Sequence, residues 1–97
     1  MKIYIAGKIT GEPNYKETFK IAENDLLEAG HAVLNPSILP LGFEHEEYIH
    51  ICKAMIDVCN VVYMLKNWKE SKGAKLEHKY AKEIGTRIAY EYEAEVK

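Results

Sequence analysis

The chain has 97 residues, of which 47% belong to the hydrophobic set and 29% are charged, and its formal net charge is −2. These values are typical of one folded domain spanning residues 1–97, and they exclude long disorder. The near-neutral charge argues against a nucleic-acid binder, and no apolar run approaches the roughly 18 residues of a membrane span.

Hydrophobic periodicity and turn residues predict strands that alternate with helices. Asn14 and Glu17 are expected to form a capping box at the start of the first helix, and Gly30 is expected to end it. Residues 37–44 are predicted to be a loop of the length that often covers a site. In chain order the elements are strand 3–6, helix 15–29, strand 31–35, helix 48–59, strand 61–65, helix 72–84 and strand 87–90.

This βαβαβαβ order, with helices as crossovers, predicts an α/β fold. The expected architecture is a Rossmann-like three-layer sandwich, with a four- or five-stranded parallel sheet, helices on both faces and strand 3–6 in the interior. Ligands of such sheets bind beyond the carboxyl ends of the strands. Those ends are residues 7–11, 35–42 and 66–73 and the stretch after Tyr90.

Glu77 occupies an unusual position in the predicted third helix. At 100° per residue it falls inside the apolar arc of that helix, while the lysines fall on the other side. That arc consists of Leu76, Tyr80, Ala81 and Ile84. A carboxylate facing the sheet needs a partner or a cavity, because an unpaired buried charge is costly. Glu77 is therefore either a structural residue or a functional carboxylate, and we favour the second interpretation.

Two glycine-containing segments lie at the same predicted edge. Ser71 and Gly73 begin the third helix, where a hydroxyl and free amides make an anion site plausible, although Ser is also a common N-cap. Gly7, Lys8 and Ile9 add backbone amides and one cation. They match neither the Walker A loop nor the dinucleotide fingerprint.

Three further residues complete the candidate substrate site. Tyr4, on the first strand, is either a core aromatic residue or the hydrogen-bond partner of Glu77. Trp68 lies in a predicted loop, where its ring either stacks on a nucleobase or serves as a lid or interface anchor. Asn35 ends the second strand and is expected to bind substrate.

The histidines and cysteines do not predict a metal site. His45, His50, Cys52 and Cys59 lack the short spacing of a closed zinc site. The two cysteines belong to the apolar stripe of their helix, which also contains Tyr48, and are expected to be core residues. About 10 Å separates those cysteines along the helix, which is too far for a disulfide. Without a signal-peptide pattern, the chain is predicted to be reduced and cytoplasmic. Its small size favours a homodimer or larger homo-oligomer.

Three motifs carry a resemblance to a known group of proteins: MKIYIAGKITG at residues 1–11, GHxVxNP at 30–36 and WxxSxGAxxE at 68–77. The chain resembles the short, often phage-encoded proteins of unknown function within the nucleoside 2-deoxyribosyltransferase superfamily. That superfamily includes enzymes that exchange bases on 2′-deoxyribose. It also includes nucleoside 5′-monophosphate N-glycosidases, which hydrolyse the same bond.

The resemblance implies a role for several of these residues. Glu77 matches the nucleophilic glutamate, Tyr4 the tyrosine that orients it, and Ser71 a serine that contacts phosphate. Gly7, Lys8 and Ile9 match the loop around the 5′ end. The resemblance also implies a small-molecule nucleotide as ligand, no metal or organic cofactor, and a neighbouring subunit that completes each site, here with residues around 90–92.

Two positions differ from the characterised enzymes. Cys52 stands where they keep an aspartate near sugar and base, and Asn60 stands where an aspartate usually starts the third strand. The first difference leaves open how a leaving base is protonated. The leading interpretation is cleavage or transfer at an N-glycosidic bond. The alternatives are a nucleotide-binding or nucleotide-sensing module and a structural adaptor.

Overall fold

The computed structural model describes residues 1–91, whose four strands form one parallel sheet in the order β2-β1-β3-β4. Tyr4 of β1 pairs with Leu34 of β2 and Val62 of β3, so β1 lies inside the sheet as predicted. The strands are β1 (Lys2–Ala6), β2 (Ala32–Leu34), β3 (Val61–Met64) and β4 (Arg87–Tyr90).

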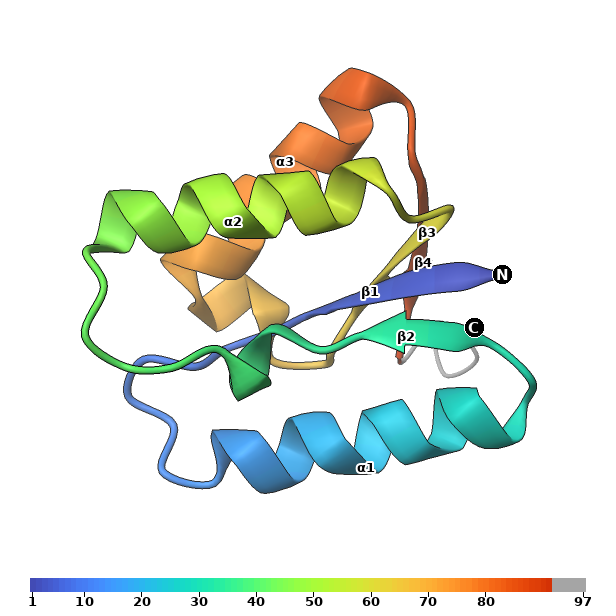
Figure 1. Ribbon diagram of the computed structural model, residues 1–97, viewed down its shortest axis with the longest axis horizontal. Coiled ribbons are helices and arrows are strands. Elements are labelled where there is room, and N and C mark those ends of the chain that lie inside the picture. The colour runs from blue at the N-terminus through green and yellow to red at the C-terminus, as the bar shows by residue number, and fades with distance from the viewer. Residues whose placement is uncertain (92–97) are drawn as a thin grey trace.

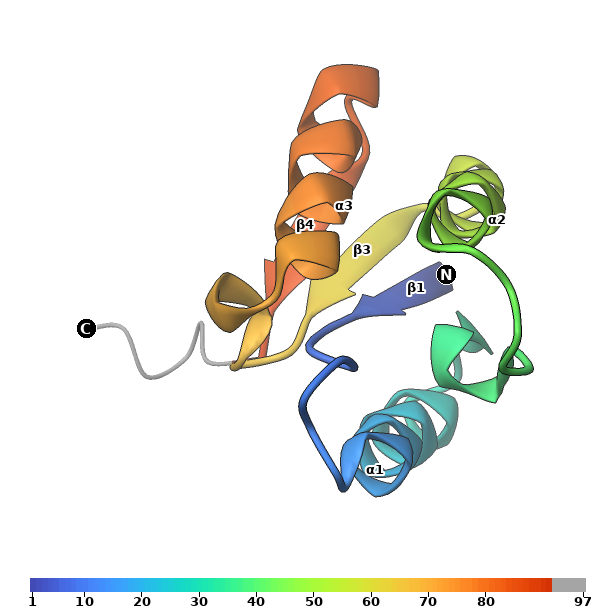
Figure 2. The same ribbon diagram turned by 90° about the vertical axis from the view of Figure 1, so that its left-hand side faces the viewer.

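Helices cover both faces of this sheet (Figures 1 and 2). Helix α1 (Tyr15–Glu28) packs on one face, and α2 (His45–Asp57) and α3 (Lys72–Ile84) pack on the other. Two short 3₁₀ turns, η1 (Pro36–Ile38) and η2 (Trp68–Glu70), follow β2 and β3. The predicted α/β sandwich is therefore confirmed, with four strands in the described part of the chain. Within residues 1–91, no helix combines the length and the apolar character needed to span a bilayer.

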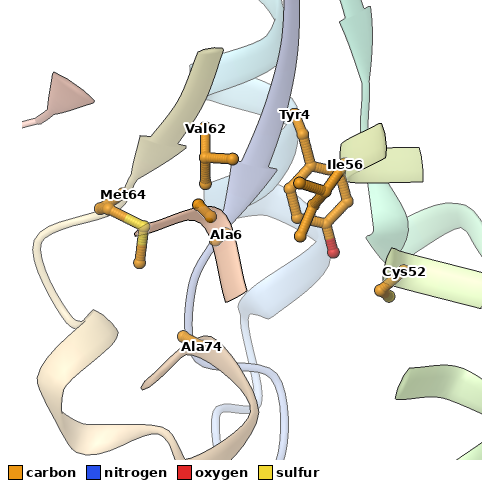
Figure 3. Packing of buried hydrophobic residues seen from close by; sticks show 8 residues of the cluster. Tyr4, Ala6, Cys52, Ile56, Val62, Met64 and Ala74 are labelled. Carbon is orange, nitrogen blue, oxygen red and sulfur yellow. The ribbon is translucent and has the colours of Figure 1, made fainter. Parts of the chain in front are cut away.

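Successive residues of β1 face opposite layers, as the pleat of a strand requires. Ile5 packs with Phe19 of α1 and with Leu65, whereas Tyr4 packs with Cys52 and neighbouring residues on the α2–α3 side (Figure 3). After β1 the chain runs close to Leu65. A Cβ at position 7 would lie 2.6 Å from Leu65 Cδ1, so Gly7 is needed for this approach.

The predicted capping box at Asn14 is wrong. The Asn14 side chain makes no cap hydrogen bond, because its backbone (φ −100°, ψ 24°) lacks the extended conformation of a typical N-cap. A turn joins Tyr15 N–H to the Glu12 carbonyl instead. A capping box is present instead at α2, where Glu44 and Glu47 bond each other's backbone N–H groups.

The predicted apolar arc of α3 is only partly buried. Ala74 and Ala81 are buried against the sheet, whereas Leu76 and Ile84 are 45% and 44% exposed. Glu77 nevertheless lies on the inner side, where it meets Tyr4.

Candidate functional site

A cavity of about 570 Å³ opens at the carboxyl edge of the sheet. Cavities of this size commonly bind small molecules. Four parts of the chain form it. They are the loop after β1 with the start of α1, the segment after β2, one face of α2, and the beginning of α3 with the two residues before it. Its lining residues are Gly7, Ile9, Thr10, Tyr15, Pro36, Ser37, Leu39, Leu41, His45, Tyr48, Ile49, Cys52, Glu70, Ser71, Lys72, Gly73, Ala74 and Glu77.

A hydrogen bond between Tyr4 and Glu77 lies beside this cavity. The fully buried Tyr4 hydroxyl donates to Glu77 Oε2 at 2.8 Å, and the half-buried Glu77 lines the cavity. Burial raises the pKa of Glu77 to about 7, although its hydrogen bonds to Tyr4 and Cys52 act in the opposite direction. Burial, and then the charge of Glu77, raise the pKa of Tyr4 well above its ordinary value. Tyr4 therefore remains a neutral donor that holds the carboxyl group.

Cys52, on α2, lies next to the Tyr4–Glu77 hydrogen bond. It is buried in the layer of Tyr4 and also contributes to the cavity wall (Figure 3). Burial, followed by the charge of Glu77, raises the pKa of its thiol to about 12. The thiol is therefore neutral at ordinary pH. Cys52 belongs to the core, as predicted, and is also a neighbour of Glu77.

The first turn of α3 faces the cavity with little side-chain cover. Ser71 is the N-cap, and its Oγ accepts from the Ala74 N–H at 3.1 Å. A Cβ at position 73 would meet only Ser71 Oγ, at 3.9 Å, so packing within the chain does not require Gly73. The first N–H groups of a helix lack intrahelical acceptors, and its N-terminus favours an anion. This turn can therefore accommodate an anionic group against its backbone.

The loop after β1 contributes to the cavity only in part. Gly7 and Ile9 line it, as expected. Lys8 is not among the lining residues. Its N–H donates to Asn67 Oδ1 at 3.1 Å, and its ammonium group lies 3.8 Å from the Glu70 carboxylate.

Asn35 and Trp68 also lie outside the cavity lining. Asn35 is buried: its Nδ2 donates to Glu23 Oε1 at 3.0 Å, and its Oδ1 accepts from Ser37 N–H at 2.9 Å. The Trp68 ring stacks on His78 with 4.2 Å between centroids. In this structure Asn35 holds η1 and Trp68 packs on α3.

Sequence reasoning missed the wall that α2 provides. His45, Tyr48, Ile49 and Cys52 all line the cavity, and their spacing of i, i+3, i+4 and i+7 places them on one helix face. The signal was present, because Tyr48 and Cys52 were recognised as part of one stripe. The cysteines of that stripe were assigned to the core alone, and His45 was considered only as a metal ligand. Within residues 1–91, no three His, Cys, Asp or Glu side chains form a group that could hold a metal ion.

The fold and the sequence have counterparts among known proteins. A family described as "Domain of unknown function (DUF4406)" matches residues 1–90, and the chain belongs to this family. No curated protein matches the chain. The solved structure of a 2-desoxiribosyltransferase from Leishmania mexicana superposes with a TM-score of 0.71 at 19% identity, covering 92% of this chain and 62% of the other. The chain thus spans less than two thirds of that protein and has the deoxyribosyltransferase fold.

Proposed function

We propose that this member of a family of unknown function binds a nucleoside 5′-monophosphate in the cavity and breaks its N-glycosidic bond with Glu77 as nucleophile. The observation that carries the proposal is the 2.8 Å hydrogen bond from Tyr4 to Glu77 beside a cavity of nucleotide-compatible size. A half-buried carboxyl group held by a tyrosine costs stability, and such perturbed groups cluster at functional sites. The fold shared with the Leishmania mexicana 2-desoxiribosyltransferase agrees with this reaction class.

In the reaction, Glu77 attacks C1′ while the bond to the base breaks, through an oxocarbenium-like transition state. A glycosyl ester on Glu77 results, and water or a second base then resolves it. The Tyr4 hydroxyl fixes one carboxylate oxygen and so orients the group for attack on C1′. Orientation of this kind reduces the entropic cost of reaching the transition state.

The phosphate is assigned to the start of α3. Gly73 lies one turn before Glu77 on α3, and the N-cap Ser71 lies nearly two turns before it, so a bound 5′-phosphate would place the sugar next to the carboxylate. Lys72 adds a positive charge to this part of the lining. Binding energy from the phosphate can then be used to orient C1′.

The test is a base-release assay with dAMP, dGMP, dCMP, dTMP and the four matching nucleosides. We expect free base from at least one monophosphate, slower release from the matching nucleoside, and none above the enzyme-free blank with Glu77→Gln. Release that continues unchanged in Glu77→Gln would refute the nucleophile. Ser71→Asp should weaken binding of the monophosphate more than binding of the nucleoside, and equal weakening in calorimetry would refute the phosphate assignment.

A second candidate function is a nucleotide sensor that binds without turnover. It is favoured by the neutral Cys52 thiol, which leaves no second carboxyl group beside Glu77 to protonate a leaving base. Binding of a monophosphate with no base release in the same assay would establish the sensor and exclude the enzyme.

A further inference from the structure

The α2 wall of the cavity begins at Cys52, next to Glu77, and ends at His45. These two residues are two helical turns, or about 10 Å, apart along the axis. Tyr48 and Ile49 lie between them on the same face and give the wall an apolar middle section. A base attached to C1′ at Glu77 would pack along this wall, with its outer edge toward His45.

Expulsion of a base needs a proton donor, because a base anion is a poor leaving group. Most acidic groups at the cavity are engaged elsewhere. The Tyr4 hydroxyl donates to Glu77, and the Tyr48 hydroxyl donates to the Pro40 carbonyl and accepts from the Phe43 N–H. The pKa of the Cys52 thiol, raised to about 12 by burial, makes that group a weak acid.

The other charged groups of the lining lie at the α3 end. Glu70 pairs with Lys8 at 3.8 Å, and Lys72 is in the first turn of α3, beside the proposed phosphate site. His45 differs from all of these. Within residues 1–91 its imidazole has no hydrogen-bond or ionic partner, and it is exposed at the mouth of the cavity. Histidine is also the side chain that most often transfers protons near neutral pH.

We propose that His45 is the general acid for the leaving base, an inference that rests on the proposed glycosidic reaction. As Glu77 bonds to C1′, the electron pair of the breaking C1′–N bond goes to the base, and the base takes a proton from the His45 imidazolium. In the second step a water oxygen bonds to C1′ and the ester bond to Glu77 breaks. The proton from that water returns to His45. The sum is nucleotide plus water giving free base plus sugar 5-phosphate.

The experiment compares two leaving groups in His45→Gln. One substrate is whichever of dAMP, dGMP, dCMP and dTMP the wild type cleaves fastest. The other is 2-deoxyribose 5-phosphate carrying 4-nitrophenolate at C1, which departs without a proton. We expect kcat for the nucleotide to fall about 100-fold or more, and release of nitrophenolate to change less than about threefold.

His50→Gln is the matched control, because His50 is an exposed histidine on α2 outside the cavity lining. It should leave both rates unchanged. Equal losses with the two substrates in His45→Gln, or an unchanged nucleotide rate, would overturn the assignment of His45 while Glu77→Gln still tests the nucleophile. A wild type that releases neither base nor nitrophenolate would refute the proposed function itself, and with it the role of His45.

Discussion

On the α1 side of the sheet, Ile5, Phe19 and Leu65 are fully buried among apolar neighbours, whereas on the α2–α3 side Tyr4 shares its layer with Cys52 and bonds Glu77. The two sides differ in how burial of their side chains changes the stability of the fold. Apolar burial stabilises the fold, while a buried carboxyl group requires donors to offset its desolvation. The α1 side thus stabilises the scaffold, and the α2–α3 side contains the chemistry that this stability supports.

The largest effect on stability is expected from Phe19→Ala on the α1 side. Removing a fully buried phenylalanine ring typically costs about 3–5 kcal/mol, because apolar contacts are lost and a cavity remains. Urea unfolding should show this loss. Base release per folded molecule should stay at the wild-type rate, since Phe19 does not line the cavity. A large fall in the rate of the folded variant would show that the two sides are not separable.

Glu77→Gln on the α2–α3 side is expected to stabilise the protein, whereas Phe19→Ala destabilises it. The pKa of Glu77 is about 7 in the folded chain against an ordinary 4.5, because burial disfavours the charged form. The folded state therefore holds a proton that the unfolded state releases, and stability falls as pH rises from about 4.5 to 7. Above pH 7 the loss in the free energy of unfolding that comes from ionising Glu77 reaches roughly 3 kcal/mol at most.

Glu77→Gln should remove this pH dependence, because glutamine has no proton to release. The measurement is the free energy of unfolding of both proteins at pH 5 and pH 8. At pH 8 the free energy of unfolding of the variant should exceed that of the wild type, and at pH 5 the difference should be much smaller. A wild type equally stable at both pH values would mean that the carboxyl group is solvated by water in the cavity.

The same comparison explains how far the sequence could predict the site. The strand and helix order follows from local patterns, and Glu77 was found because a carboxylate interrupts an apolar arc. Asn35 is expected to bind substrate, and Trp68 either to stack on a nucleobase or to serve as a lid or interface anchor. In the structure Asn35 bonds Glu23 and Trp68 stacks on His78. Their partners come from α1 and α3, and no local pattern specifies such contacts.

The α2 wall was missed for a related reason. A face that lines a cavity and a face that fills a core both show apolar residues at helical spacing, so Tyr48 and Ile49 cannot be assigned to one or the other from the sequence. The distinction depends on how far α2 lies from the segment after β2. The predicted dimer and the residues around 90–92 stay predictions, and positions 92–97 lie outside the described residues.

An effect of intermediate size, on the rate of base release, is expected from Tyr4→Phe on the α2–α3 side. Tyr4→Phe removes the donor to Glu77, so the pKa of Glu77 should rise further and the ionised fraction at pH 7 should fall. Relative to the wild type at the same pH, base release should drop about tenfold at pH 7 and recover in part at pH 9. Tyr63→Phe is the control, because Tyr63 packs on the α1 side. Equal pH–rate profiles for the two variants would contradict the orienting role of Tyr4.

The smallest effect on stability is expected from Gly73→Ala. The new Cβ would have only an ordinary contact, 3.9 Å from Ser71 Oγ, and alanine favours the helix by about 0.5–1 kcal/mol. The free protein should therefore melt at a slightly higher temperature.

If the phosphate lies against this turn, the methyl group should weaken monophosphate binding about tenfold and nucleoside binding much less. Gly85→Ala is the control at the other end of α3, where φ is +77°: it should destabilise the protein and leave binding unchanged. Calorimetry that finds full monophosphate affinity in a stabilised Gly73→Ala protein would place the phosphate elsewhere in the cavity.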